Sequence, residues 1–183
     1  MDNASPAAPS ACDGRGFTLV EVLIVAAVIS ALAAISVPGL IRARRASLES
    51  AAIASLRTIT SAEATYASSC ARGGYAQTLE DLSKPATGAA QLFISPDIAA
   101  NGTAKSGYIF NVGPDAGAMT VLAAGATCNA ASLDAVSGYF AEAHPAQAAL
   151  GQRAFASDTR GIIFYNMDGA TIDAGMAGAQ PLH

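Results

Sequence analysis

The stretch that decides the fold runs from Phe17 to Ile41 and reads FTLVEVLIVAAVISALAAISVPGLI. It contains a single ionisable side chain, Glu21, and is longer than the ~20 apolar residues that a helix needs to cross a hydrocarbon layer. A cleaved secretory signal has a basic start, an apolar core of about 7 to 15 residues and a cut site after that core. The preceding residues 1–16, MDNASPAAPSACDGRG, have no apolar core. The stretch therefore predicts a membrane-spanning helix.

Two residues inside the predicted span, Glu21 and Pro38, interrupt its apolar character. A carboxylate in hydrocarbon costs about 3 kcal/mol or more, so Glu21 is expected to pair with a cation. The alternative is a helix-end Glu that only extends to the membrane interface. Pro38 removes a backbone donor and predicts a bend or a locally melted turn, with a passive kink at the end of the span as the alternative.

The junction Gly16-Phe17-Thr18-Leu19, followed by Glu21, resembles the signal of type IV prepilins and pseudopilins. The resemblance covers residues 14–69. It implies that a membrane aspartyl protease, the prepilin peptidase, cuts after Gly16 on the cytoplasmic side and methylates the new amine of Phe17. It also implies that Glu21 of an incoming subunit pairs with the Phe17 amine of a neighbour, and that Pro38 allows curvature and partial unwinding of the helix.

The same resemblance implies partners and a location. The expected partners are further copies of the chain in a homopolymeric filament, the prepilin peptidase, an inner-membrane assembly platform and the membrane itself. Before assembly the chain is expected to cross the inner membrane once, with a periplasmic C-terminal domain. After assembly it is expected in a filament at the cell surface or in a periplasmic pseudopilus.

The basic residues depart from the family pattern. Family leaders are usually basic, whereas this one carries only Arg15 against two aspartates. Arg42, Arg44 and Arg45 follow the span directly, and the positive-inside tendency alone would place the C-terminal domain in the cytoplasm. The cytoplasmic cut site outweighs that tendency. The arginine cluster is expected to meet lipid headgroups or acidic neighbours.

Beyond the span the helical pattern continues without Pro or Gly to Arg72, which predicts one helix from Phe17 to about Ser69, ended by Gly73 and Gly74. Residues 42–69 form its amphipathic half. An apolar stripe is expected to lie against a sheet; its members are Leu48, Ala52, Leu56, Ile59, Ala62 and Tyr66. Three charged residues are expected to face solvent or other subunits, namely Glu49, Arg57 and Glu63.

Residues 70–183 predict a globular head domain. Four segments are rich in strand formers: Gly107–Val112, Ala118–Ala123, Gly138–Ala143 and Gly161–Asn166. Hairpin turns are expected at 114–117 and 168–169, and the tail after Asp173 is expected to be mobile. The predicted fold class is α+β, a long N-terminal helix packed on an antiparallel sheet of about four strands, as in pilins.

Two of the three cysteines, Cys70 and Cys128, remain after the predicted cut, because Cys12 lies in the leader. An even number of cysteines in an exported domain predicts a disulfide. It would close a long loop and contribute roughly 4 kcal/mol. Two free buried thiols are the alternative.

No enzymatic activity, metal site or cofactor is expected. The two histidines, His144 and His183, form no recognisable catalytic arrangement. Asp158, Asp168 and Asp173 lie near turns in the region where some pseudopilins hold calcium, but their spacing favours turn-forming aspartates.

The overall composition limits the class of protein further. The chain has 183 residues and a net charge of −4 without a basic block, which argues against nucleic acid as the main partner.

The expected function is a structural subunit of a type IV pilus-like filament. Removal of 16 of the 183 residues leaves 167, which is long for a major type II secretion pseudopilin, the first alternative. The second alternative is a membrane-anchored binding domain that never polymerises.

Overall fold

A computed structural model describes residues 16–147 and 153–182. Residues 1–15, which belong to the predicted leader and include Cys12 and Arg15, lie outside the described residues, as does His183. The described chain divides into two compact units that meet between Ile41 and Arg42. We call them the span unit, which ends at Ile41, and the head unit, which begins at Arg42.

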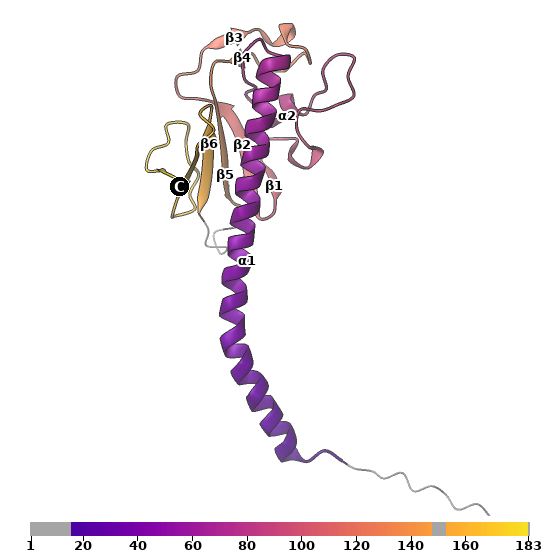
Figure 1. The fold of residues 1–183 in the computed structure, drawn as a ribbon, viewed down its shortest axis with the longest axis vertical. Coiled ribbons are helices and arrows are strands. Elements are labelled where there is room, and N and C mark those ends of the chain that lie inside the picture. Colours follow the sequence, from indigo (N-terminus) through magenta and orange to yellow (C-terminus); the bar gives the residue numbers. More distant parts are fainter. Residues whose placement is uncertain (1–15, 148–152, 183) are drawn as a thin grey trace, which may run out of the picture. The chain divides into compact units, whose positions relative to one another are not determined.

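Helix α1 runs from Leu19 to Ser69 without a break (Figure 1). The predicted long helix is confirmed, although it begins two residues after Phe17. At its other end Gly73 adopts φ +92° and donates its N–H to the Ala67 carbonyl oxygen at 2.8 Å. Because a left-handed conformation is easy only for glycine, Gly73 ends the helix where the sequence predicts.

In the span unit, every side chain from Phe17 to Ile41 is exposed. The helix is long and apolar enough to cross a membrane, with a mean hydropathy of 2.6 in its most apolar window. Pro38 lies inside α1, and the helix continues through it. The locally melted turn expected at Pro38 is therefore absent from this structure.

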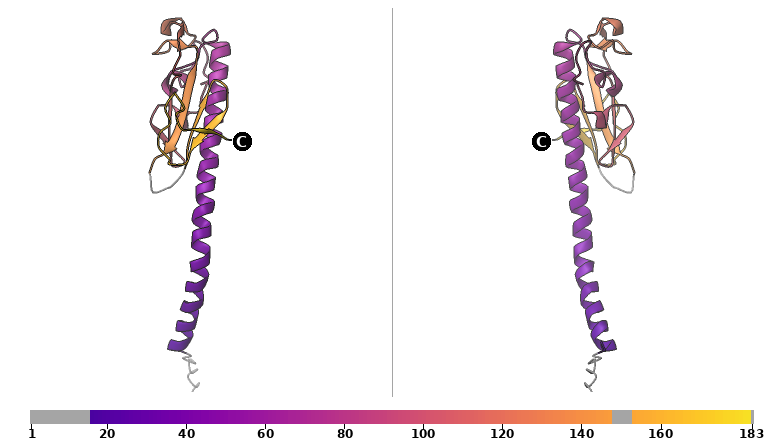
Figure 2. Two further views of the ribbon diagram at one scale, coloured as in Figure 1. Left: turned by 90° about the vertical axis from the view of Figure 1, so that its left-hand side faces the viewer. Right: turned by 90° about the vertical axis from the view of Figure 1, so that its right-hand side faces the viewer.

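In the head unit, α1 packs along one face of a sheet (Figures 1 and 2). The predicted apolar stripe is confirmed, since its members contribute to the core. Leu48 is partly buried, and the other five are fully or almost fully buried. The sheet side of the same core is formed by aromatic and aliphatic residues, among them Tyr108, Phe110, Val112, Tyr139 and Phe155.

The head contains a six-stranded antiparallel sheet in the order β1-β2-β5-β6-β7-β8 and a separate two-stranded sheet, β3-β4. The strands are β1 Thr103–Lys105, β2 Tyr108–Pro114, β3 Thr120–Leu122, β4 Ala135–Val136, β5 Tyr139–Pro145, β6 Ala154–Asp158, β7 Ile163–Asn166 and β8 Gln180–Pro181. The shorter elements are α2 Leu79–Leu82 and the 3-10 helices η1 Pro96–Ile98 and η2 Ala124–Ala126.

The predicted α+β arrangement is confirmed, but the strand count of about four was too low. Three of the predicted segments correspond to β2, β5 and β7 of the main sheet, whereas Ala118–Ala123 corresponds to β3, which lies outside it. The sequence missed β1, β4, β6 and β8. Three of these four have only two or three residues, too few for an alternating pattern to be visible.

Both predicted hairpins are wrong. The chain does turn at Pro114–Gly117, but β2 pairs with β5 through a register that ends at Pro114 and Tyr139, and β3 pairs with β4 instead. A turn also follows β7 at Asp168, where the carboxylate accepts the Ala170 N–H at 3.0 Å. The strand that pairs with β7 is β8, which begins only at Gln180, so the turn at Asp168 does not form a hairpin.

The mobility expected after Asp173 stays a prediction, but the segment 172–181 packs on the sheet. Its buried Ile172 joins Phe140, Ala154 and Ala156 in a second apolar cluster, with Met176 packed against them. These strand residues alternate with residues of the main core, so they occupy the face of the sheet away from α1. The tail therefore covers part of the outer face before β8 closes the sheet edge.

Candidate processing and assembly site

Gly16 and Phe17 lie just before the first helical residue. A Cβ added to Gly16 would meet no atom within 4 Å, and the residue lacks the positive φ that favours glycine. The described fold therefore does not require glycine at position 16.

Thr18 caps the N-terminus of α1. Its Oγ1 accepts the Glu21 N–H at 3.2 Å, and its carbonyl oxygen accepts the Val22 N–H at 3.3 Å. This is one half of a capping box, a motif with Ser or Thr at the cap and Glu three residues later. The cap leaves Phe17 outside the helix, where an amine produced by cleavage would stand free.

Glu21 lies in the first turn of α1, is exposed and forms no ion pair within residues 16–147 and 153–182. A carboxylate in the first turn interacts favourably with the positive end of the helix dipole, whereas an amine at that end is disfavoured. A free Phe17 amine would therefore need a counter-charge. Glu21 supplies a charge of the right sign within one helical turn.

Cys70 and Cys128 are bonded to each other in a disulfide, as the sequence predicts. Their Cα atoms are 4.7 Å apart, and they lie 58 positions apart in the sequence. The Cys128 N–H also donates to the Cys70 carbonyl oxygen at 3.2 Å. The bond thus fixes the loop after η2 to the end of α1.

Glu63 is fully buried in the head, contrary to the expectation that it faces outward. It lies four residues after Ile59 and three before Tyr66, so it shares their helix face. One carboxyl oxygen accepts the Ala76 N–H at 2.9 Å. The other has no hydrogen-bond partner among the described residues, and neither do the hydroxyl groups of Tyr66 and Tyr139.

Burial raises the pKa of Glu63 from its ordinary value of 4.5 to about 8, although the hydrogen bond from Ala76 opposes the shift. Burial also raises the pKa of Tyr139 to about 12. The cause is desolvation, because a charge in an apolar interior loses its interaction with water. Glu63 is therefore neutral in the folded head at pH 7.

Glu49 is half-buried and bound to Arg153, so the expectation that it faces freely outward is also wrong. Arg153 donates from Nη2 to Glu49 Oε2 at 2.6 Å and from Nε at 3.1 Å. Its guanidinium lies over the rings of Phe155 and Tyr165, which adds a cation–π contact. Of the three charged residues expected to face outward, only Arg57 is exposed.

The three aspartates considered for calcium are engaged separately. Asp158 pairs with Arg160, Asp168 accepts the Ala170 N–H, and Asp173 accepts the Gly175 N–H. Among the residues that the structure describes, no group of three or more His, Cys, Asp or Glu side chains could hold a metal ion.

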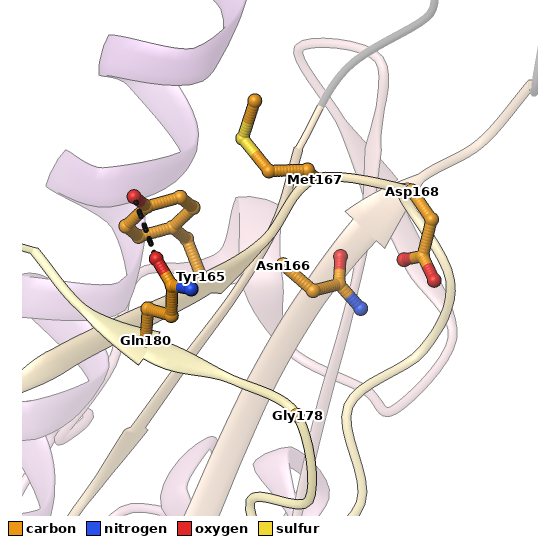
Figure 3. Close-up of a pocket in the computed structure, with 6 residues that line it drawn as sticks. All are labelled: Tyr165, Asn166, Met167, Asp168, Gly178 and Gln180. Carbon is orange, nitrogen blue, oxygen red and sulfur yellow. Dashed lines mark hydrogen bonds between the residues drawn. The ribbon is translucent and has the colours of Figure 1, made fainter.

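Asp168 also borders a pocket of about 270 Å³ at the end of β7 (Figure 3). Tyr165 and Gln180, from neighbouring strands, lie side by side in this pocket and share a 3.3 Å hydrogen bond. Asp168 carries the one carboxylate side chain among the residues that line this pocket.

Comparison with known families gives a match at the N-terminus. Residues 14–37 match the family described as "Prokaryotic N-terminal methylation motif". Searches of curated proteins and of solved structures gave no significant match. The chain carries the N-terminal signature of type IV pilins and pseudopilins. The long helix packed on an antiparallel sheet is a pilin-like arrangement, in agreement with this signature.

Sequence reasoning missed two site residues. Thr18 could have been found from the spacing Thr18-x-x-Glu21, which is the capping-box pattern. The burial of Glu63 had a weaker signal, its position between Ile59 and Tyr66 on the apolar stripe.

Proposed function

We propose that the chain is a structural subunit of a type IV pilus-like filament and polymerises through residues 17–41 of α1. In this proposal a prepilin peptidase cuts after Gly16 and methylates the Phe17 amine. The new amine then pairs with Glu21 of a neighbouring subunit, and an inner-membrane assembly platform adds subunits to the filament. Neither enzymatic activity nor a cofactor is part of the proposal.

One observation carries this proposal: a fully exposed apolar helix with a lone carboxylate begins directly after a prepilin-type junction. A simple membrane anchor needs an apolar helix but neither Gly16 nor Glu21. The methylation motif supports cleavage ahead of the span, which keeps the helix in the product. The lone Glu21 supports pairing with a second molecule, because an unpaired carboxylate in hydrocarbon is costly.

The proposal assigns the remaining regions supporting roles. Residues 1–16 form the removable leader, 17–41 the span and assembly surface, 42–69 the amphipathic half of the helix, and 70–183 the head domain. Pro38 allows α1 to adapt in the filament, because its missing N–H leaves the Ala34 carbonyl oxygen without the usual helical donor. The disulfide keeps the head folded outside the reducing cytoplasm.

Intact-mass analysis of the chain purified from membranes tests the processing step. The product should begin at Phe17, carry one N-methyl group and retain the span. A product that begins at Met1, or beyond Ser36, would contradict the proposal. Electron microscopy of sheared surface fibres, with mass spectrometry of their subunits, then tests polymerisation. Fibres confined to the periplasm would favour the type II secretion pseudopilin.

A further inference from the structure

Three arginines, Arg42, Arg44 and Arg45, lie within four residues at the start of the head unit. All three are exposed, as is every residue from 42 to 47. None of them forms an ion pair with a described residue. The structure thus leaves a concentrated positive charge without a partner among the described residues.

The nearest carboxylate on the helix is already engaged. Glu49 is the only acidic residue within four positions of any of the three arginines, and it follows Arg45 by four positions, the less favourable order for an i,i+4 ion pair. Both of its oxygens bind Arg153, Oε2 through the guanidinium and Oε1 through the backbone N–H. The chain therefore uses an arginine from the far end of the sequence to neutralise Glu49.

The three arginines point in different directions around the helix. At about 100° per residue they spread over about 160° of its circumference. Three arginines that point in such different directions cannot all reach one carboxylate on a facing surface. They can each bind a separate anionic group if such groups surround the helix. The phosphate groups of a membrane surface have this arrangement.

The length of the span places the arginines at the second membrane surface. From Leu19 to Ile41 α1 rises about 33 Å, slightly more than the ~30 Å thickness of the hydrocarbon core. A helix that starts at one interface therefore brings Arg42 to the headgroup level of the opposite leaflet. Arginine side chains at the end of a membrane span extend to the headgroup level, where each guanidinium can donate several hydrogen bonds to phosphate.

We propose that Arg42, Arg44 and Arg45 form a binding site for the phosphate groups of anionic phospholipids in the leaflet next to the head. The inference rests on the proposed membrane anchoring but not on polymerisation. The bound lipids would hold an unassembled subunit at a fixed depth. They would also supply the negative charge that the chain itself does not place near the arginines.

Lipid selectivity measured by electron paramagnetic resonance tests the site. The full chain is reconstituted in phosphatidylcholine vesicles that contain a trace of spin-labelled phosphatidylglycerol or spin-labelled phosphatidylcholine. The motionally restricted fraction of each label reports lipids in contact with the protein. We expect wild type to enrich phosphatidylglycerol over phosphatidylcholine by about fivefold or more, because one basic residue near an anionic surface already contributes about that factor. The enrichment should fall at high salt.

The decisive variant is R44Q/R45Q, and its matched control is R57Q/R72Q, which also removes two exposed arginines from the head unit. The first should lose most of the preference for phosphatidylglycerol, whereas the control should keep it. Restricted phosphatidylcholine should be the same in all three proteins, because the apolar span alone determines it.

Each other outcome contradicts the site in a recognisable way. Equal enrichment of both lipids by wild type, or an unchanged preference in R44Q/R45Q, would overturn it. If lipid selectivity is absent and fibres fail in R44Q/R45Q, the arginines bind acidic residues of a neighbouring subunit instead. If the protein restricts the motion of neither spin label, both the proposed membrane anchoring and this inference are wrong. If fibres are missing but lipid selectivity is present, only the proposed polymerisation is wrong.

Discussion

The two halves of α1 place the same kind of residue in opposite surroundings. In the span unit Glu21 is exposed among exposed apolar side chains, and no described residue pairs with it. In the head unit Glu63 is fully buried and accepts a backbone N–H. The head neutralises its carboxyl group by raising the pKa, whereas Glu21 remains available to another molecule.

The apolar surfaces of the two halves differ in the same way. The sheet of the head covers the stripe from Leu48 to Tyr66. No described element covers the side chains from Phe17 to Ile41. One half of the helix is thus covered by its own chain, whereas no described residue covers the apolar surface of the other half.

The largest effect is expected from Glu21→Ala, which should abolish fibres. Membrane insertion should persist or improve, because a lone carboxylate opposes partitioning by about 3 kcal/mol. Assembly should fail because the neighbouring Phe17 amine loses its counter-charge in an apolar bundle. Membrane-bound and sheared-fibre pools, compared by immunoblot, give the result.

Glu80→Ala is the control for Glu21→Ala, because it removes an exposed carboxylate from the head. Its fibre yield should match wild type, and both variants should still be cut after Gly16. A normal fibre yield from Glu21→Ala, in cells without wild-type subunits, would show that Glu21 does not direct assembly.

The second-largest effect is expected from removal of the disulfide between Cys70 and Cys128. The variant C70S/C128S should lower the free energy of unfolding by roughly 4 kcal/mol, because the unfolded chain regains the entropy of a loop of 58 positions. Urea denaturation followed by tyrosine fluorescence measures it, since the chain has no Trp. Cys12→Ser, which changes the leader cysteine, should leave the value unchanged. Free labelling of both thiols in native wild type would argue against the disulfide.

The third prediction is that the free energy of unfolding of the head depends on pH through Glu63. The folded head keeps the proton up to about pH 8, whereas the unfolded chain releases it near pH 4.5. The Glu63 contribution to stability is therefore complete below pH 4.5, declines between pH 4.5 and 8, and is lost above pH 8. The decline should amount to a few kcal/mol. Urea denaturation across this range should show it.

Glu63→Gln should remove this decline. The amide oxygen can still accept the Ala76 N–H, and its NH₂ group can donate to the unpaired hydroxyl oxygen of a nearby tyrosine. The variant should match wild type at pH 4 and exceed it at pH 9. Glu80→Gln, at an exposed position, should retain the wild-type decline. An identical decline in Glu63→Gln would assign the pH dependence to another group.

The smallest effect should come from the N-terminal cap of α1. Thr18→Ala removes the acceptor for the Glu21 N–H and should destabilise the first turn by about 1 kcal/mol. Hydrogen exchange of the Glu21 amide should then be about fivefold faster in micelles. Thr18→Ser keeps the hydroxyl and should exchange at the wild-type rate. Unchanged exchange in Thr18→Ala would show that Thr18 does not cap the helix.

The helix could be predicted because its signals are long and agree with one another. The span, the apolar stripe and the terminal glycines point to one element from the start of the span to Ser69. The disulfide could be predicted because two cysteines remain after the predicted cut and an even number in an exported domain favours pairing. The residues of the N-terminal junction could be found because their order and spacing are specific.

The sheet could be predicted only in part. Strand β6 reads AFASD, with no β-branched residue, and its pairing depends on β5 and β7 at either side. Strand β8 has two residues and pairs across a distance that no local pattern reveals. Local turn signals at Pro114 and Asp168 were real, but a turn does not determine which strands pair.

The position of residues 172–181 has a consequence for the order of folding. Ile172 covers Phe140 and the alanines of β6, and β8 adds the edge strand of the main sheet, so both steps wait until residues 172–181 have been synthesised. The N-terminal helix is made first and can enter the membrane well before that point. A ribosome that stops before residue 172 would therefore release an inserted chain with an uncovered apolar face, which is a substrate for proteolysis.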